Sequence, residues 1–322
     1  MTESKTYNPE VFNAVETGLS STPKRLPSWL FYDEVGDKIF QAIMRSPAYY
    51  LTACEFDILQ RQKEKIWHHI AKDKEPFKLV ELGAGDGTKT EVLLKYFLSK
   101  PLPFTYVPVD VSVAVLEQLQ QRLNKSMPDL DILLENKLYQ EALNDLKSNH
   151  EERKLIMFLG ANIGNFKVED AIKFVKNLTG SMNETDLLLI GFDLKKDPRL
   201  IQAAYDDSEG ITREFNLNLL SRINREFGGQ FKTESFSHYP YYDPETGVTK
   251  SFLVSKWKQD VFIEVLDREI HFDKNEIIHT EVSQKYDLKM IQQLAMQNDL
   301  EVVDVLYDKN EYFADVMFRL KD

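Results

Sequence analysis

The sequence predicts an α/β protein built on a mostly parallel sheet, with a second α+β region and an antiparallel hairpin that closes the sheet. Between residues 78 and 194, short apolar runs alternate with longer amphipathic segments. The apolar runs are continuous rather than alternating, as expected for strands that are buried on both faces of a parallel sheet. The expected strands cover 78–82, 104–110, 131–135, 154–160 and 186–194, and the expected helices lie near 88–99, 112–125, 139–147 and 167–180.

The pattern changes after Asp197. Residues 203–228 form a polar stretch with helical character, and an aromatic-rich segment follows it. The DPETG sequence at 243–247 predicts a turn between two antiparallel strands. A helix near 287–298 and two apolar runs, 301–308 and 312–320, end the chain and predict the closing hairpin.

Composition excludes several classes of protein. The chain has 322 residues and a formal net charge of −12, with 52 acidic against 40 basic residues, so no general nucleic-acid binding is expected. A single cysteine, Cys54, precludes an internal disulfide and suits a reducing compartment. The first residues lack the apolar core of a signal peptide, and no run is long and apolar enough for a membrane span. We therefore expect a cytoplasmic globular protein that acts as a monomer, without nucleic-acid or membrane partners.

The histidines do not suggest a metal site. The six histidines are scattered, and the adjacent pair His68 and His69 would point to different sides of a helix. No metal is expected.

Three glycines at alternate positions, Gly83, Gly85 and Gly87, follow the first expected strand in the sequence VELGAGDGTKT. Such a turn lets a ligand approach bare backbone. A dinucleotide site would prefer a third glycine at the position of Thr88, and a Walker-type loop does not fit the spacing. S-adenosylmethionine is the remaining ligand class, and Glu81 before the turn could face its ammonium or fix the loop.

Asp110 ends the second expected strand, about 25 residues beyond the glycines. A carboxylate at that strand edge can accept both ribose hydroxyls of a nucleoside. Alternatively, Asp110 caps the helix that follows, although Ser112 is itself a plausible N-cap.

Longer segments then resemble one family, the histidine Nα-methyltransferases of ergothioneine biosynthesis, which also includes fungal methyltransferases of tryptophan-derived amines. The similar segments, in family order, are LPSWLFYDEVGDKIFQAIMRSPAYYLTACE, LVELGAGDGTKT, YVPVDVS, MFLGANIGNF, GFDLKKDPRLIQAAYDDSEGITREFN and HTEVSQKY. The resemblance implies a Rossmann-like methyltransferase domain, residues 57–196 and 285–322, that binds S-adenosylmethionine. It also implies a substrate-binding domain, residues 1–56 and 197–284, with the substrate between the two.

The resemblance further implies the cofactor-binding residues. Gly83, Ala84 and Gly85 would carry the cofactor, Lys89 would lie near its carboxylate, and Asp110 would hold the ribose. The adenine would lie near Asn136, where relatives commonly carry aspartate. An amide carbonyl can still accept a hydrogen bond from the adenine amine.

The resemblance likewise implies the substrate site and the catalytic residues, Asn165 and Tyr32. Asn165 and the backbone of Gly160 would lie near the α-amine, with Tyr32 and Phe40 around it. Tyr49 and Tyr205 would hold the α-carboxylate. Glu281 and Ser283 would contact the side chain, where a carboxylate and a hydroxyl suit an imidazole. Ser251 stands where histidine-specific members usually carry methionine, which opens the specificity to another aromatic amino acid.

Each of these residues also has an ordinary structural interpretation. The aromatic residues could belong to the core, Glu281 could be a surface acid, Asn165 could be a left-handed turn residue, and AYDDSEG could be a helix terminus. Their joint occurrence in one family's order favours trimethylation of the L-histidine α-amine. The alternatives are methylation of another aromatic amino acid or amine, and a non-catalytic S-adenosylmethionine-binding protein.

Overall fold

The computed structural model describes residues 7–148 and 152–321, which form two compact units. Unit 1 comprises Met1–Tyr50 and Lys196–Ser283, and unit 2 comprises Leu51–Lys195 and Gln284–Asp322. Unit 2 thus begins at Leu51, whereas the sequence suggested residue 57.

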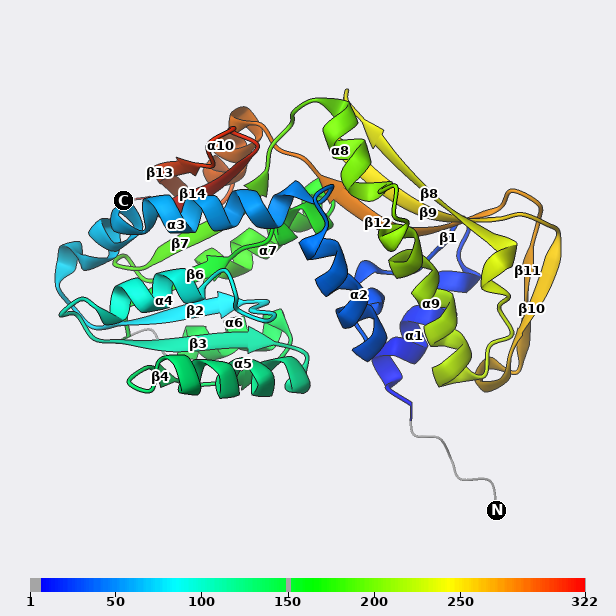
Figure 1. The fold of residues 1–322 in the computed structure, drawn as a ribbon, viewed down its shortest axis with the longest axis horizontal. Coiled ribbons are helices and arrows are strands. Elements are labelled where there is room, and N and C mark those ends of the chain that lie inside the picture. Colours follow the sequence, from blue (N-terminus) through cyan, green and yellow to red (C-terminus); the bar gives the residue numbers. More distant parts are fainter. Residues whose placement is uncertain (1–6, 149–151, 322) are drawn as a thin grey trace, which may run out of the picture. The chain divides into compact units, whose positions relative to one another are not determined.

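Unit 2 contains, in its described residues, an eight-stranded sheet (Figure 1). The strand order is β13-β14-β7-β6-β2-β3-β4, and β5 also pairs with β3. The strands are β2 (Phe77–Leu82), β3 (Phe104–Asp110), β4 (Asp131–Ile132), β5 (Glu135–Asn136), β6 (Lys154–Phe158), β7 (Leu187–Asp193), β13 (Leu300–Tyr307) and β14 (Phe313–Leu320). Strands β2 to β7 pair in parallel, whereas β14 pairs antiparallel with both β7 and β13. The predicted fold class, with its closing hairpin, is confirmed.

Helices cover this sheet because its strands are apolar on both faces. The helices are α3 (Tyr50–Ile70), α4 (Glu91–Leu98), α5 (Val113–Ser126), α6 (Tyr139–Ser148), α7 (Val168–Thr179) and α10 (Leu288–Met296), with 3₁₀ turns η2 (Ala71–Asp73) and η3 (Asn162–Asn165). Apolar residues of α6, α7 and α10 share one core with alternate residues of the central strands. The intervening strand residues point to the opposite face, because side chains alternate along a strand.

One expected strand of unit 2 is wrong. Residues 131–135 do not form a continuous strand, because β4 ends at Ile132 and pairing with β3 resumes only at Glu135. Leu133 between them is exposed, although its amide still donates to the carbonyl of Tyr106. The segment lies at the edge of the sheet, where no further strand enforces regular pairing.

Unit 1 combines a four-stranded sheet, in the order β1-β12-β9-β8, with a separate β10-β11 hairpin. The strands are β1 (Lys24–Arg25), β8 (Phe236–Asp243), β9 (Val248–Ser255), β10 (Gln259–Ile263), β11 (Arg268–Phe272) and β12 (Ile277–Gln284). The helical elements are α1 (Pro9–Ser20), η1 (Ser28–Phe31), α2 (Glu34–Arg45), α8 (Pro198–Tyr205), α9 (Ile211–Phe227), η4 (Thr233–Ser235) and η5 (Glu264–Leu266). The turn predicted at 243–247 joins β8 to β9.

The polar stretch at 203–228 is two helices rather than one. Helix α8 ends at Tyr205, and α9 begins at Ile211. The carboxylate of Asp207 accepts hydrogen bonds from the amides of Ile211 and Thr212, at 2.9 and 2.8 Å, and so satisfies the first donors of α9. The AYDDSEG segment is therefore a helix terminus, as its structural interpretation predicted, and it also places Tyr205.

Candidate active site

The turn after β2 contains three glycines, which differ in what a side chain would meet at each position. All three have positive φ, at 73°, 55° and 60° for Gly83, Gly85 and Gly87. A Cβ on Gly83 would lie 2.5 Å from the hydroxyl of Tyr139, and a Cβ on Gly87 would lie 2.5 Å from Leu119. A Cβ on Gly85 would meet nothing within 4 Å. Gly85 therefore combines a left-handed backbone with open space, as a ligand cradle requires.

Asp110 holds the glycine turn in place. Its Oδ2 accepts the amide of Gly85 at 3.0 Å, and its Oδ1 accepts the amide of Ser112 at 3.0 Å. Ser112, rather than Asp110, is the N-cap of α5, since its hydroxyl accepts the amide of Val115. Each carboxylate oxygen retains a second lone pair for a ligand hydroxyl.

Asn136 lies beside Asp110, because β5 pairs with β3 at these two residues. The amide nitrogen of Asn136 donates to the backbone carbonyl of Asp110 at 3.0 Å. Asn136 is exposed. The side-chain carbonyl oxygen, which takes no part in that hydrogen bond, can accept one from an adenine amine.

Glu81 fixes the loop. Its two carboxyl oxygens accept hydrogen bonds from the hydroxyls of Thr90, at 2.6 Å, and Tyr106. Burial raises the pKa of Glu81 to about 7, although both hydroxyls favour the ionised form. Of the two roles expected from the sequence, these contacts favour the structural one.

Lys89 lies on the first turn after the glycines and forms an ion pair with Glu55 of α3. Its ammonium also lies close to Gly160, where a Cβ would be 3.7 Å from Nζ. Gly160 and Lys89 thus come together, although they are far apart in the sequence.

Asn165 ends the 3₁₀ turn η3, which follows β6. The left-handed residues of this segment are Gly160 and Ala161, with φ of 76° and 57°, and Asn165 does not have positive φ. The interpretation of Asn165 as a left-handed turn residue is therefore wrong. Its side chain forms no hydrogen bond with the residues that the structure describes, and it is partly exposed.

In unit 1, the aromatic residues expected around the amine form one group. The ring centroids of Tyr32 and Phe40 lie 5.5 Å apart, and those of Phe40 and Tyr49 lie 6.3 Å apart, both edge to face. Phe215 packs against Tyr32 and Phe40 from α9. Tyr32 is 39% exposed and Phe40 is partly buried, so this group borders the core rather than filling it.

Tyr205 and Ser283 are also brought together. The hydroxyl of Tyr205 donates to Oγ of Ser283 at 2.9 Å, and both residues are buried. Tyr49 packs against the small cluster that contains Tyr205 and Tyr242. The two tyrosines assigned to one carboxylate are therefore neighbours.

Ser251 and Glu281 form a second polar pair, with the hydroxyl donating to Oε2 at 2.9 Å. Thr280, next to Glu281, bonds to Oδ1 of Asn216 at 2.7 Å and to the carbonyl of Ser251 at 3.0 Å. Glu281 is partly buried and bound to a hydroxyl, which argues against its interpretation as a free surface acid.

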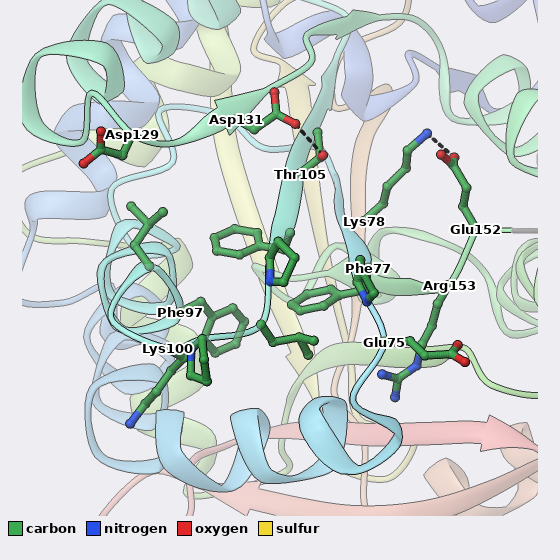
Figure 2. A pocket seen from close by; sticks show the side chains of 16 residues that line it. Glu75, Phe77, Lys78, Phe97, Lys100, Thr105, Asp129, Asp131, Glu152 and Arg153 are labelled. Carbon is green, nitrogen blue, oxygen red and sulfur yellow. Dashed lines mark hydrogen bonds and ion pairs between the residues drawn. The ribbon is translucent and has the colours of Figure 1, made fainter.

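A cavity of about 870 Å³ lies in unit 2, and none of the site residues expected from the sequence lines it (Figure 2). It is lined by the residues at which β2 and β3 begin, including Phe77 and Phe104, whereas the glycine turn follows the end of β2 and Asp110 is the last residue of β3. Ligands of open α/β sheets bind outside the carboxyl ends of the strands. The cavity is therefore at the opposite end of the sheet from the expected cofactor.

Within residues 7–148 and 152–321, no three histidine, cysteine, aspartate or glutamate side chains are grouped so that they could hold a metal ion. His150 lies outside these residues. Nor does any helix in the same ranges combine the length and apolar character needed to cross a bilayer.

The glycine cradle after the first strand, the acid after the second and the closing hairpin together define a Rossmann-like, S-adenosylmethionine-dependent methyltransferase. A family described as histidine-specific, S-adenosylmethionine-dependent methyltransferases matches residues 11–320 of the chain. The chain belongs to this family, and its methyl donor is S-adenosylmethionine.

Similar proteins of known name agree with this assignment. The histidine N-alpha-methyltransferases of Mycolicibacterium smegmatis and Mycobacterium tuberculosis are each 34% identical over 272 residues, covering 84% of this chain and 83% of theirs. Ergothioneine biosynthesis protein 1 of Schizosaccharomyces pombe is 31% identical over 72% of this chain, but over only 31% of its own length.

Several residues that support the expected site could not be assigned a role from the sequence. Glu55, Tyr139, Phe215 and Thr280 contact expected site residues but had no expected role, although Glu55, Phe215 and Thr280 lie within segments that resemble the family. Glu55 is the one that a pattern could have indicated, because it is an acid among apolar residues on α3 and is fully buried.

Proposed function

We propose that this protein transfers methyl groups from S-adenosylmethionine to the α-amino nitrogen of L-histidine, up to the trimethylated betaine, hercynine. The observation that carries the proposal is the position of Glu281 on β12. Residues 281 and 283 point to the same face of the strand, so a carboxylate and a hydroxyl are presented together. Two relatives that are 34% identical over most of both chains are named histidine N-alpha-methyltransferases, which supports the α-nitrogen of histidine as the acceptor.

A carboxylate and a hydroxyl side by side suit an imidazole. The ring offers one N–H donor, which Glu281 can accept, and one acceptor nitrogen, to which a hydroxyl such as that of Ser283 can donate. An indole ring has an N–H for Glu281 but no acceptor nitrogen for the hydroxyl, and a phenyl ring has neither, so it would leave the partly buried carboxylate without a ring partner.

Unit 2 has the groups required to hold the cofactor. The backbone of Gly83, Ala84 and Gly85 would receive it, with Asp110 at the ribose and Asn136 at the adenine. Lys89 is a cation suited to its carboxylate. When bound, the cofactor supplies a methyl group on a sulfonium that is already a good leaving group.

The substrate amine must be neutral to act as a nucleophile. Asn165 and the backbone of Gly160 are our candidates for orienting it, since alignment of the amine with the methyl group supplies most of what the reaction requires. No dedicated base is assigned. Free α-amines titrate near pH 8, so the rate should rise between about pH 6 and pH 9.

The remaining candidates bind the rest of the amino acid. Tyr49 and Tyr205 would hold the α-carboxylate. The rings of Tyr32 and Phe40 would face the nitrogen, and an aromatic face also accommodates the permanent cation that trimethylation produces.

A second candidate function is methylation of another aromatic amino acid, and Ser251 is the observation that favours it. This residue is a buried serine where histidine-specific members usually carry methionine. A smaller side chain leaves more room at that wall of the pocket.

Mass spectrometry after incubating purified protein with S-adenosylmethionine and an equimolar mixture of the twenty amino acids tests the proposal. The proposed function predicts histidine with one to three added methyl groups. A different methylated amino acid would support the second candidate and overturn the first.

We also propose that the protein works in the cytoplasm as a monomer, without nucleic-acid or membrane partners. The net charge of −12 supports the exclusion of nucleic acids. Light scattering after size-exclusion chromatography would test the monomer, and a mass of twice 37.5 kDa would contradict it.

A further inference from the structure

A buried group of charged residues lies beside the expected cofactor site in unit 2. We call Glu55 of α3, Lys89 and Asp315 of β14 the Glu55 cluster. Glu55 and Asp315 are completely buried, while the side chain of Lys89 is 24% exposed. Charged side chains are rarely buried unless they are paired, so the cluster requires an explanation.

Glu55 joins two segments that are expected to contact different ligands. Its Oε1 accepts the backbone amide of Gly160 at 2.6 Å, and its Oε2 accepts the ammonium of Lys89. Gly160 belongs to the loop assigned to the substrate amine, and Lys89 is assigned to the cofactor carboxylate. One carboxylate therefore fixes a group from each of the two expected subsites.

Gly191 of β7 provides the space for this arrangement. A Cβ at Gly191 would lie 2.5 Å from Oε1 of Glu55 and 3.2 Å from Oδ1 of Asp315. Asp315 is the β14 residue directly opposite Gly191 in the sheet. The two carboxyl groups thus share the space that a side chain at position 191 would take.

The two carboxyl groups have different partners. Glu55 is bound at both oxygens, whereas neither oxygen of Asp315 has a hydrogen-bond partner among the described residues. Burial and the neighbouring charge of Glu55 raise the pKa of Asp315 well above its ordinary value, against the opposing effect of Lys89. The unpaired Asp315 carboxyl therefore disfavours its charged form, whereas Glu55 binds the Lys89 ammonium and the Gly160 amide directly.

The charged state of Lys89 depends on the negative charge of Glu55. Burial lowers the pKa of Lys89, but Glu55 outweighs it through its charge and hydrogen bond, assisted by the charges of Glu81 and Asp315, so the pKa lies above its ordinary value. Without Glu55, burial would favour the neutral amine.

We propose that Glu55 is a positioning residue of the cofactor site, which holds the Lys89 ammonium beside the Gly160 amide and keeps it charged for the cofactor's carboxylate. This proposal rests on the proposed function only in assigning the cofactor carboxylate to Lys89. It does not depend on which amino acid is methylated.

The test is the affinity for S-adenosylhomocysteine, measured by calorimetry between about pH 6.5 and pH 9.5 without any amino acid substrate. Glu55→Gln keeps the size of the side chain and an oxygen for the Gly160 amide, but it replaces the negative charge at Lys89. We expect the variant to lose affinity for S-adenosylhomocysteine as the pH rises. At about pH 9.5 this loss should exceed any change in the wild type by about tenfold.

Asp315→Asn is the matched control, since it removes the other buried carboxyl of the cluster. Because Asp315 forms no hydrogen bond with Lys89 or Gly160, this variant should keep the wild-type pH profile, within about twofold in affinity. If Asp315→Asn reproduces the effect of Glu55→Gln, or if Glu55→Gln follows the wild-type profile, the proposal is overturned.

A double-mutant cycle tests whether Glu55 acts through Lys89. In a Lys89→Met background, Glu55→Gln should change the affinity no further, because the group that it holds is absent. An additive loss would contradict the proposal. If Glu55→Gln alone leaves Lys89 as an unpaired buried cation and fails to fold, a folded double variant, which lacks this cation, would support the proposal. Failure of both variants to fold would count against the proposal. A protein that fails to methylate histidine but binds S-adenosylhomocysteine would contradict the proposed function and leave this test intact.

Discussion

The hydroxyl of Ser251 donates to Oε2 of Glu281 at 2.9 Å, between two strands of unit 1. A serine therefore takes part in holding the carboxylate that we assign to the substrate side chain. A methionine at this position would make no such hydrogen bond. The orientation of Glu281 and the identity of residue 251 are consequently linked in this chain.

Ser251→Ala should lower kcat/KM for histidine by about tenfold, because a charge-assisted hydrogen bond that orients Glu281 is lost. Turnover of phenylalanine, whose ring needs no carboxylate, should change little, so competing the two amino acids in one assay measures the effect directly. An equal loss for both substrates would show that Ser251 supports the fold rather than the recognition of the ring.

Asp110→Asn should weaken S-adenosylhomocysteine binding by about a hundredfold and lower the free energy of unfolding by about 2 kcal/mol. Asp110 accepts the amides of both Gly85 and Ser112, whereas an amide side chain can offer an oxygen to only one of them. Calorimetry and urea unfolding give the two quantities. An unchanged affinity would remove Asp110 from the cofactor site.

Gly83→Ala should lower the free energy of unfolding by about 3 kcal/mol, from the left-handed backbone and the clash with the Tyr139 hydroxyl. Gly85→Ala is the matched control, because it carries only the backbone cost of about 1–2 kcal/mol. Removing the hydroxyl with Tyr139→Phe should restore part of the stability of Gly83→Ala and none of that of Gly85→Ala. Urea unfolding of the four variants would reveal whether the clash is real.

Much of the α/β architecture could be predicted from the sequence because it depends on local patterns. The strand at 104–110 and the strands on either side of the 243–247 turn follow from apolar runs and turn residues. The break after Tyr205 was predicted only as one alternative for AYDDSEG, because the residues before and after it are both helical in character and only the capping by Asp207 separates them. The continuous strand expected at 131–135 was wrong for a similar reason, because the apolar composition of the segment does not reveal that it lies at the edge of the sheet.

The candidate site likewise contains residues that local patterns predict and residues that only the fold brings together. The glycine turn and Asp110 are visible because strand ends and their spacing are local features. Glu55 itself stands out as an acid among apolar residues, but its role could not be predicted, because its partners Lys89 and Gly160 are 34 and 105 residues away along the chain. No periodicity relates residues that distant, and only the folded sheet brings them together.

His238 makes the stability of unit 1 sensitive to acid. Burial lowers the pKa of His238 to about 4, despite the nearby acids Asp206 and Asp207 and with a small further effect of Arg213. Its Nε2 has no hydrogen-bond partner among the described residues. The unfolded chain takes up this proton near pH 6.5, while the folded protein resists protonation down to about pH 4.

The wild type should therefore lose about 3 kcal/mol of unfolding free energy through His238 as the pH falls across this window. His238→Gln cannot titrate there, so its loss between about pH 7 and pH 4.5 should be smaller by most of that amount. Urea unfolding at both pH values measures the difference. Parallel losses in the two proteins would show that His238 is protonated in the folded state.

The most direct test of histidine methylation is the mass of the product formed from L-histidine and S-adenosylmethionine by the purified wild-type protein, with Glu281→Gln alongside it. We expect histidine carrying up to three methyl groups on the α-nitrogen, formed at least about tenfold more slowly by the variant. Methylation of a ring nitrogen, or no methylated histidine from a protein that binds the cofactor, would contradict the proposed function.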